Sequence, residues 1–177
     1  MAERVTSVHT DALPALRFIG RQCRCHPQEF TARWSEWFEN GWFFQLEKIG
    51  IAPENGGAYL GLTIGDTYWI GLLFPPGTPV PDGFEYADHP AATYAVFGMD
   101  GRASGELFGE EGIRLVQEEM GRRGMREGVD AWGIEKYRCL KRADSGKQTN
   151  LLYEFWIAIE KAHYGKFRLD GKGFRYR

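Results

Sequence analysis

The chain has 177 residues, a formal net charge of −2 and 43% hydrophobic content, which fits one domain with a sizeable core. The near balance of charge excludes the strongly basic footprint of a nucleic-acid-binding domain and the charged composition of a disordered chain. The unusual quantity is aromatic content, with 6 Trp, 8 Tyr and 12 Phe making up 15% of the residues. Aromatic rings build cores, and they also line pockets for flat or cationic ligands.

No stretch approaches the roughly 18 consecutive apolar residues of a membrane span, and the N-terminus lacks the regions of a signal peptide. Three cysteines, an odd number, do not make a disulfide framework. We therefore expect a reduced, cytoplasmic protein with no membrane partner. Cys23, Cys25 and His26 lie close together, but no second group of ligands follows them. Half-buried strand cysteines are favoured over a metal site, and no cofactor is expected.

The first half predicts strands, a helix and a hairpin. Residues 4–9 and 16–25 alternate as extended segments, and a proline at residue 27 suits the first turn of a helix. Apolar residues at 30, 34, 37 and 38 then follow the spacing of an amphipathic helix, which Gly41 is expected to interrupt before a second short apolar stretch. Residues 58–74 predict two strands joined by a tight turn at Gly65-Asp66.

The second half predicts a similar order of elements. After the proline-rich residues 75–83, residues 84–90 and 91–99 resemble two short strands. A helix follows near residues 110–123, with glutamates in its first turn and arginines in its last, as the helix dipole favours. Residues 125–139 are interpreted as a connection, and residues 150–161 predict the last strand.

The order of elements predicts an α+β fold built from a duplicated strand–helix–strand–strand unit. No sequence repeat accompanies it, so the duplication is inferred from element order alone. We expect an antiparallel sheet with both helices on one face. If the two halves pair about a pseudo-twofold axis, the other face forms a central ligand groove.

Glu154 is the most informative candidate for the site. It is the only charge between Leu151 and Ile159, in a predicted strand that places Trp156 on the same face. A carboxylate among rings is costly unless it is paired, exposed or neutralised. One interpretation is a solvent-facing strand with a hydrated Glu154. The other is a carboxylate at the floor of a pocket, which together with Trp156 binds a cationic ligand.

Other aromatic residues are candidates for the same groove. Tyr68 and Trp69 alternate in the strand TYWIGLLF, so one of these two rings faces the groove. Tyr94 and a third set, in which Trp132 and Tyr137 flank Glu135, follow further along the chain. Core packing is the alternative role for each of these rings. The chain lacks the nucleophile elbow, the P-loop, the His-Glu-x-x-His motif and the dinucleotide fingerprint.

Charge is unevenly distributed along the chain. Residues 161–177 carry six basic residues and one acidic residue, a net charge of +5, whereas the preceding 160 residues carry −7. Such a basic segment can contact nucleic acid or an acidic surface. It can equally fold back onto the acidic body of its own chain, or remain solvated.

The segments TYWIGLLFPPGTPVPDGFEYADHPAATYAVFGMDG, WGIEKY and LLYEFWIAIEK, in this order, resemble the GyrI-like small-molecule-binding domains. These domains also serve as effector-binding domains of multidrug-sensing transcription activators. The resemblance implies a domain over residues 1–161, a basic extension over 162–177, and the duplicated fold described above. It also implies an aromatic cleft with an acidic floor. Glu154 matches the acidic position, and Tyr68 matches the aromatic position of the middle strand.

Three functions follow from the resemblance. The first is a stand-alone binding module for lipophilic, aromatic or cationic small molecules, without direct nucleic-acid binding. The second is a hydrolase of reactive, cyclopropane-type molecules, with Glu154 as general base and Tyr68 as proton donor. The third is a protein-interaction role such as gyrase inhibition. The ligand site predicted for the first function comprises Glu154, Trp156, Tyr68, Trp69, Tyr94, Trp132 and Tyr137.

Overall fold

The computed structural model describes residues 4–24, 26–101, 110–138 and 151–160. Cys25 and the basic extension 162–177 lie outside these ranges. The strands are β1 (Arg4–Leu13), β2 (Leu16–Cys23), β3 (Ala58–Ile64), β4 (Thr67–Phe74), β5 (Glu85–His89), β6 (Ala92–Gly101), β7 (Trp132–Arg138) and β8 (Leu151–Ile159). The α-helices are α1 (Phe30–Glu39), α2 (Trp42–Glu47) and α3 (Glu110–Arg122), with short 3-10 turns η1 (Pro27–Glu29) and η2 (Pro53–Asn55).

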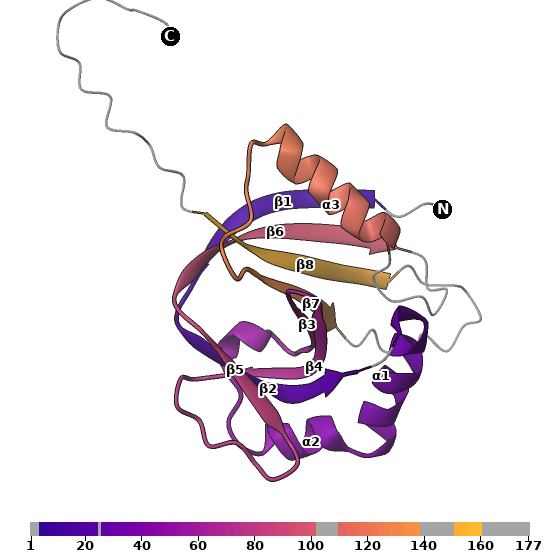
Figure 1. The fold of residues 1–177 in the computed structure, drawn as a ribbon, viewed down its shortest axis with the longest axis vertical. Helices are drawn as coiled ribbons and strands as arrows, with labels where there is room; N and C mark the ends of the chain where they lie inside the picture. Colours follow the sequence, from indigo (N-terminus) through magenta and orange to yellow (C-terminus); the bar gives the residue numbers. More distant parts are fainter. Residues whose placement is uncertain (1–3, 25, 102–109, 139–150, 161–177) are drawn as a thin grey trace, which may run out of the picture.

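The strands form one antiparallel sheet in the order β1-β6-β8-β7-β3-β4-β2-β5, as Figure 1 shows. This order contains the same unit twice, β2-α1-β3-β4 and β6-α3-β7-β8. In each unit the last strand lies between the other two, and the units meet where β3 pairs with β7. The strands β5 and β1 extend the two outer edges. The α+β fold and its duplicated unit are therefore confirmed.

The sequence pattern does not reveal one of the strands. The interpretation of residues 125–139 as a connection is wrong for Trp132–Arg138, which form β7 at the junction of the two units. Six of its seven residues are buried, among them Gly133, Glu135 and Lys136. Because both faces of this strand are covered, its polar residues do not alternate with apolar ones in the way that marks a half-exposed strand.

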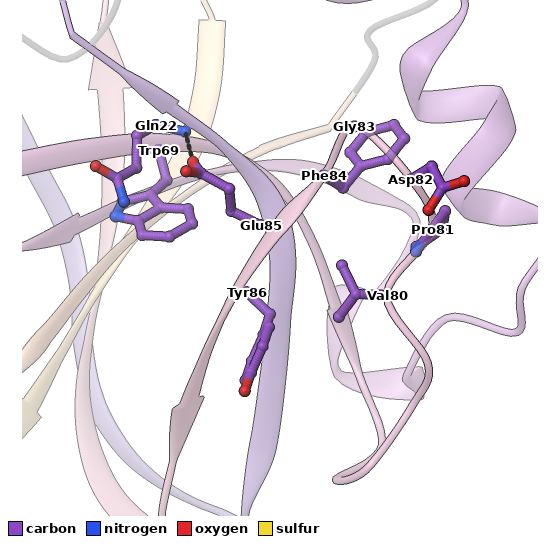
Figure 2. Close-up of a pocket in the computed structure, with 9 residues that line it drawn as sticks. All are labelled: Gln22, Trp69, Val80, Pro81, Asp82, Gly83, Phe84, Glu85 and Tyr86. Carbon is purple, nitrogen blue, oxygen red and sulfur yellow. Dashed lines mark hydrogen bonds between the residues drawn. The ribbon is translucent and has the colours of Figure 1, made fainter.

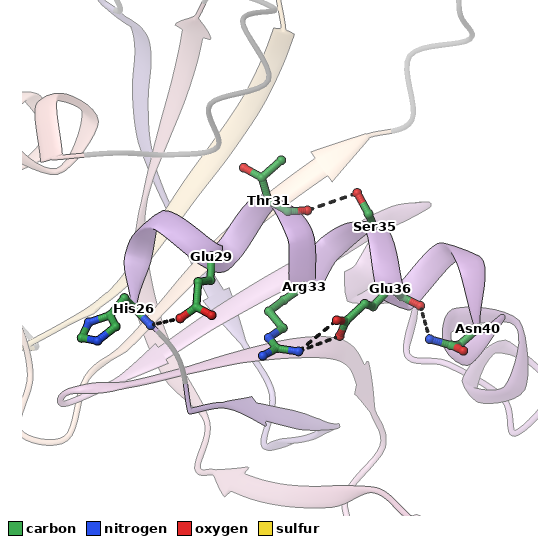
Figure 3. A network of polar contacts seen from close by, with 7 residues as sticks. All are labelled: His26, Glu29, Thr31, Arg33, Ser35, Glu36 and Asn40. Carbon is green, nitrogen blue, oxygen red and sulfur yellow. Dashed lines mark hydrogen bonds and ion pairs between the residues drawn. The ribbon is translucent and has the colours of Figure 1, made fainter.

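The helix α1 is amphipathic, as its spacing predicts. Trp34 and Trp37 are buried against the sheet, and the opposite side carries polar contacts (Figure 3). In one of them, Arg33 donates to the Glu36 carboxylate at 2.9 Å. Gly41 adopts a left-handed conformation with φ of 66° and separates α1 from α2, as predicted. The helix α3 lies over β1 (Figure 1).

Strand alternation distributes the rings between the two faces of the sheet. Tyr68 contacts the rings of α1, whereas the next residue, Trp69, points to the opposite face. On that opposite face Trp132 contacts Phe18 and His89, with ring centroids 6.3 and 4.8 Å away. The cluster of Phe18, Trp69 and Trp132 on this face is part of the core of the domain.

None of the helices in the described ranges is long and apolar enough to cross a membrane. Within the same ranges there is no group of three or more His, Cys, Asp or Glu side chains that could hold a metal ion.

Candidate functional site

A buried carboxylate lies at the junction of the two units. Glu135, in the middle of β7, is only 5% exposed. The hydroxyls of Tyr68 and Tyr137 both donate to its Oε2 atom, each at 2.9 Å. The two hydroxyls stabilise the ionised form. No hydrogen bond from a described residue reaches the other oxygen, Oε1.

The sheet register brings these groups together. Glu135 and Tyr137 are two residues apart on β7 and therefore share a face. Gly61 on β3 pairs with Glu135, and Tyr68 projects from the neighbouring strand β4. A Cβ atom at Gly61 would lie 2.9 Å from Glu135 Oε2 and would overlap the Tyr68 hydroxyl. The absence of a side chain at Gly61 therefore makes room for the contact between Tyr68 and Glu135.

The helix α1 covers the carboxylate with two rings. The Trp34 indole Nε1 donates to the Tyr68 hydroxyl at 3.0 Å, and its ring packs edge-on against Tyr137. Phe30 stacks on Tyr68, with ring centroids 4.2 Å apart. Because the Tyr68 hydroxyl accepts from Trp34, its single proton is directed at Glu135.

Burial raises the pKa of Glu135 from 4.5 to about 7, and the hydrogen bonds from Tyr68 and Tyr137 oppose part of that rise. Burial also raises the pKa of Tyr68 well above its usual value, so this residue remains a proton donor. A carboxyl group with a pKa near neutrality can release or accept a proton, and its ionised form attracts a cation. The site therefore offers either proton transfer or a buried negative charge.

Glu154, for which the sequence left open a solvent-facing and a pocket-floor position, lies on the face of the sheet opposite to Glu135. Its side chain is 30% exposed, whereas Glu135 is the buried acid among the residues that the structure describes. The Trp156 indole donates to Glu154 at 2.9 Å, and Arg138 forms an ion pair with it at 3.7 Å. The Lys136 ammonium lies over the Trp156 ring, 4.2 Å from its centroid. The chain's own cations already contact both the carboxylate and the ring that were expected to bind a ligand.

The remaining predicted residues divide between the two faces. Tyr68 and Tyr137 join Glu135 beneath α1. Trp69, Tyr94, Trp132 and Trp156 lie on the opposite face, where Tyr94 contacts Trp156 with centroids 6.3 Å apart. The sequence analysis names Glu135 only as a companion of Trp132 and Tyr137, and places Trp34 on the apolar side of a helix. The useful signal is the two-residue spacing of Glu135 and Tyr137, which predicts a shared face once residues 132–138 are recognised as a strand.

Two cavities lie away from this carboxylate. One of about 540 Å³ lies beside the start of β5 (Figure 2), lined by Gln22, Trp69, Val80, Pro81, Asp82, Gly83, Phe84, Glu85 and Tyr86. The other, of about 240 Å³, is lined by Thr6, Gly98, Met99, Lys136, Arg138, Tyr153 and Glu154.

No protein-family model matches the chain, and none of the curated proteins matches it significantly. Several solved structures, in contrast, match the chain in fold. SAV2435 bound to tetraphenylphosphonium superposes with a TM-score of 0.65 at 14% identity, covering 88% of this chain and 94% of that one. A predicted transcription regulation protein of Staphylococcus aureus MU50 gives 0.60 at 13% identity, covering 88% and 99%. These two superpositions show that the fold of this chain is GyrI-like. EcmrR, in a complex with DNA, gives 0.60 at 9% identity, and the match spans 88% of this chain but 57% of EcmrR.

Proposed function

We propose that the domain binds lipophilic cations, with Glu135 as the counter-charge. The observation that carries this proposal is a carboxylate, buried beneath aromatic rings, that pairs with no Lys or Arg of the described residues. A buried carboxylate that accepts hydrogen bonds but has no opposite charge beside it is still costly, and a cationic ligand would reduce that cost. The similar fold of SAV2435, whose structure contains the lipophilic cation tetraphenylphosphonium, supports the same class of ligand.

The ligand would replace aromatic rings of α1. Phe30 and Trp34 cover Tyr68 and Tyr137, so a bound molecule reaches Glu135 when these two rings withdraw. An aromatic ligand restores the lost ring contacts with rings of its own, and its charge faces Oε1 of Glu135. A desolvated cation against an aromatic face contributes about 2 kcal/mol, in addition to its attraction to the carboxylate.

Titration calorimetry with tetraphenylphosphonium tests this role. The wild-type protein should bind at micromolar concentration, and Glu135→Gln, which keeps the size of the side chain, should weaken binding at least tenfold. Glu154→Gln is the matched control, because it removes a carboxylate from the opposite face, and its affinity should equal that of the wild type. Equal affinity of wild type and Glu135→Gln would refute the assignment, and loss of binding in Glu154→Gln would move the site to the other face.

One observation favours hydrolysis as a second function. Glu135, with its pKa raised to about 7 by burial, is in direct contact with two tyrosine hydroxyls. Such a group can deprotonate water while Tyr68 protonates the leaving atom. Turnover of an electrophilic cyclopropane, monitored by loss of the substrate, should then disappear in Glu135→Gln and in Tyr68→Phe. Binding of such a substrate without turnover would leave only the binding function.

A further inference from the structure

The cavity of about 540 Å³ carries two acidic side chains and lies at an open edge of the sheet. Asp82 and Glu85 line it, and neither forms an ion pair with a Lys or Arg among the described residues. From the described residues, Glu85 accepts only a hydrogen bond from the Gln22 backbone N–H, at 3.2 Å (Figure 2). Two carboxylates that form no ion pair with a described residue favour a basic occupant.

The walls of the cavity suit an occupant that also carries rings. Val80, Pro81 and Phe84 supply apolar surface beside the half-exposed ring of Tyr86. Trp69 is only 6% exposed, and its indole Nε1 is a buried donor with no acceptor among the described residues. Leaving such a donor unpaired is unfavourable, so an occupant with a carbonyl oxygen would gain a hydrogen bond there.

The adjoining strand has one unpaired side. β5 is the last strand of the sheet, and it pairs only with β2 among the described strands. The backbone groups on its outer side are available to a further extended segment, which is the usual mode of peptide recognition at a sheet edge. A polypeptide therefore fits this surface better than a compact small molecule does.

We propose that the chain's own C-terminal segment, residues 161–177, docks along β5 and into this cavity. Its net charge of +5 complements the two free carboxylates and the −7 of the remaining chain. Its distal part, Gly171–Arg177 (GKGFRYR), combines basic side chains with Phe174 and Tyr176, the two kinds of group that the cavity accommodates. Docking covers an edge that would otherwise be free to pair with another molecule.

The distance from Ile159, at the end of β8, to Glu85 in the cavity is within the reach of the C-terminal segment. Ile159 pairs with Thr93, and Thr93 lies only eight residues along the chain from Glu85. One strand spacing and eight extended residues amount to about 33 Å at most. Lys172, thirteen residues beyond Ile159, spans about 43 Å when extended. By contrast, the two residues to Lys161 span about 7 Å.

Carbodiimide cross-linking of the full-length protein tests the proposal, since it joins a carboxylate to a lysine amine with loss of water. We expect a cross-link between Lys172 and Asp82 or Glu85 in the monomer, mapped by mass spectrometry, and no such cross-link to Lys161. The double variant Asp82→Asn/Glu85→Gln should reduce the yield at Lys172 at least tenfold. Asp66→Asn removes an exposed carboxylate at the turn between β3 and β4 and should leave the yield unchanged.

A second measurement does not depend on cross-linking chemistry. The indole N–H resonance of Trp69 should differ between wild type and Lys172→Gln/Arg175→Gln/Arg177→Gln, because the docked segment contacts this ring. The indole resonance of Trp34, beneath α1, should be the same in both. The proposal would be overturned if Lys172 cross-linked evenly to exposed carboxylates or if its cross-links were confined to dimers. An unchanged Trp69 resonance would overturn it as well.

Discussion

Gly61 and Glu135 face each other across the boundary between β3 and β7. Each residue lies at the centre of its strand, and the two strands are equivalent members of the duplicated units. The pseudo-twofold relationship therefore places a glycine in one unit at the position of a carboxylate in the other. The space left by the glycine is occupied by the Tyr68 hydroxyl and the Glu135 carboxylate, so the duplicated fold forms one polar site here.

Gly61→Ala should disrupt this arrangement. The new methyl group would overlap the Tyr68 hydroxyl, and overpacking of a buried site costs about 1–3 kcal/mol. Urea denaturation should show a loss of this size, together with weaker binding of tetraphenylphosphonium. Gly121→Ala in α3 is the matched control, because its Cβ meets nothing within 4 Å and alanine favours a helix by about 0.5–1 kcal/mol. A Gly61→Ala protein as stable as wild type would contradict the packing described.

The raised pKa of Glu135 predicts how stability depends on pH. The pKa rises from the ordinary glutamate value of 4.5, which applies to the unfolded chain, to about 7 in the folded protein, so between these values the folded state binds more protons. The contribution of this group to the free energy of unfolding should therefore decrease by about 3 kcal/mol as pH rises from 4.5 to 7. Above pH 7 it should stay level. Glu135→Gln lacks the decrease and should exceed wild type in stability at pH 8, while approaching it at pH 5.

Urea denaturation of both proteins at pH 5 and pH 8 measures this difference. Glu154→Gln should retain the wild-type dependence, since Glu154 is partly exposed and already paired with Arg138. A wild-type protein whose stability relative to Glu135→Gln is the same at both pH values would show that Glu135 is not buried as described.

Tyr68→Phe should raise the pKa of Glu135 further. The Tyr68 hydroxyl lowers this pKa by donating to the carboxylate, so its removal disfavours the ionised form. Binding of tetraphenylphosphonium requires that form, and its pH midpoint should move to higher pH in the variant. Tyr94→Phe, on the opposite face, removes a hydroxyl that contacts His89 and should leave the midpoint unchanged. A shift to lower pH in Tyr68→Phe would contradict the donor role.

Most elements of the fold could be predicted because their signals are local. The helix pattern at Trp34 and Trp37, the break at Gly41 and the hairpin at Gly65 each depend on neighbouring residues alone. The strand β7 could not be read in this way. Its buried Lys136 donates to the backbone carbonyl of Glu54 at 2.8 Å, across 82 positions of sequence. In the sequence alone, Lys136 resembles a solvated charge next to the charge of Glu135.

The same long-range dependence explains why the sequence favours Glu154 over Glu135. Alternation shows which residues share a face, but not which face a helix covers. Glu154 is a single charge in an apolar run, whereas Glu135 adjoins a lysine. The decisive contacts of Glu135 come from Gly61 and Tyr68, which lie in the other unit. Only the pairing of β3 with β7 brings them together.

Phe30→Ala tests whether the ligand replaces rings of α1. Phe30 is partly buried and stacks on Tyr68 at 4.2 Å. Removing its ring opens the path to Glu135, so a ligand no longer has to displace it, and tetraphenylphosphonium should bind several-fold more tightly. Phe44→Ala in α2 removes a ring that is 61% exposed and should leave the affinity unchanged. The lost stacking destabilises the free protein by about 1 kcal/mol. Because the variant binds the ligand more tightly, added ligand should nevertheless raise the melting temperature of Phe30→Ala more than that of wild type. Weaker binding in Phe30→Ala would instead mean that Phe30 contacts the ligand and stays in place when it binds.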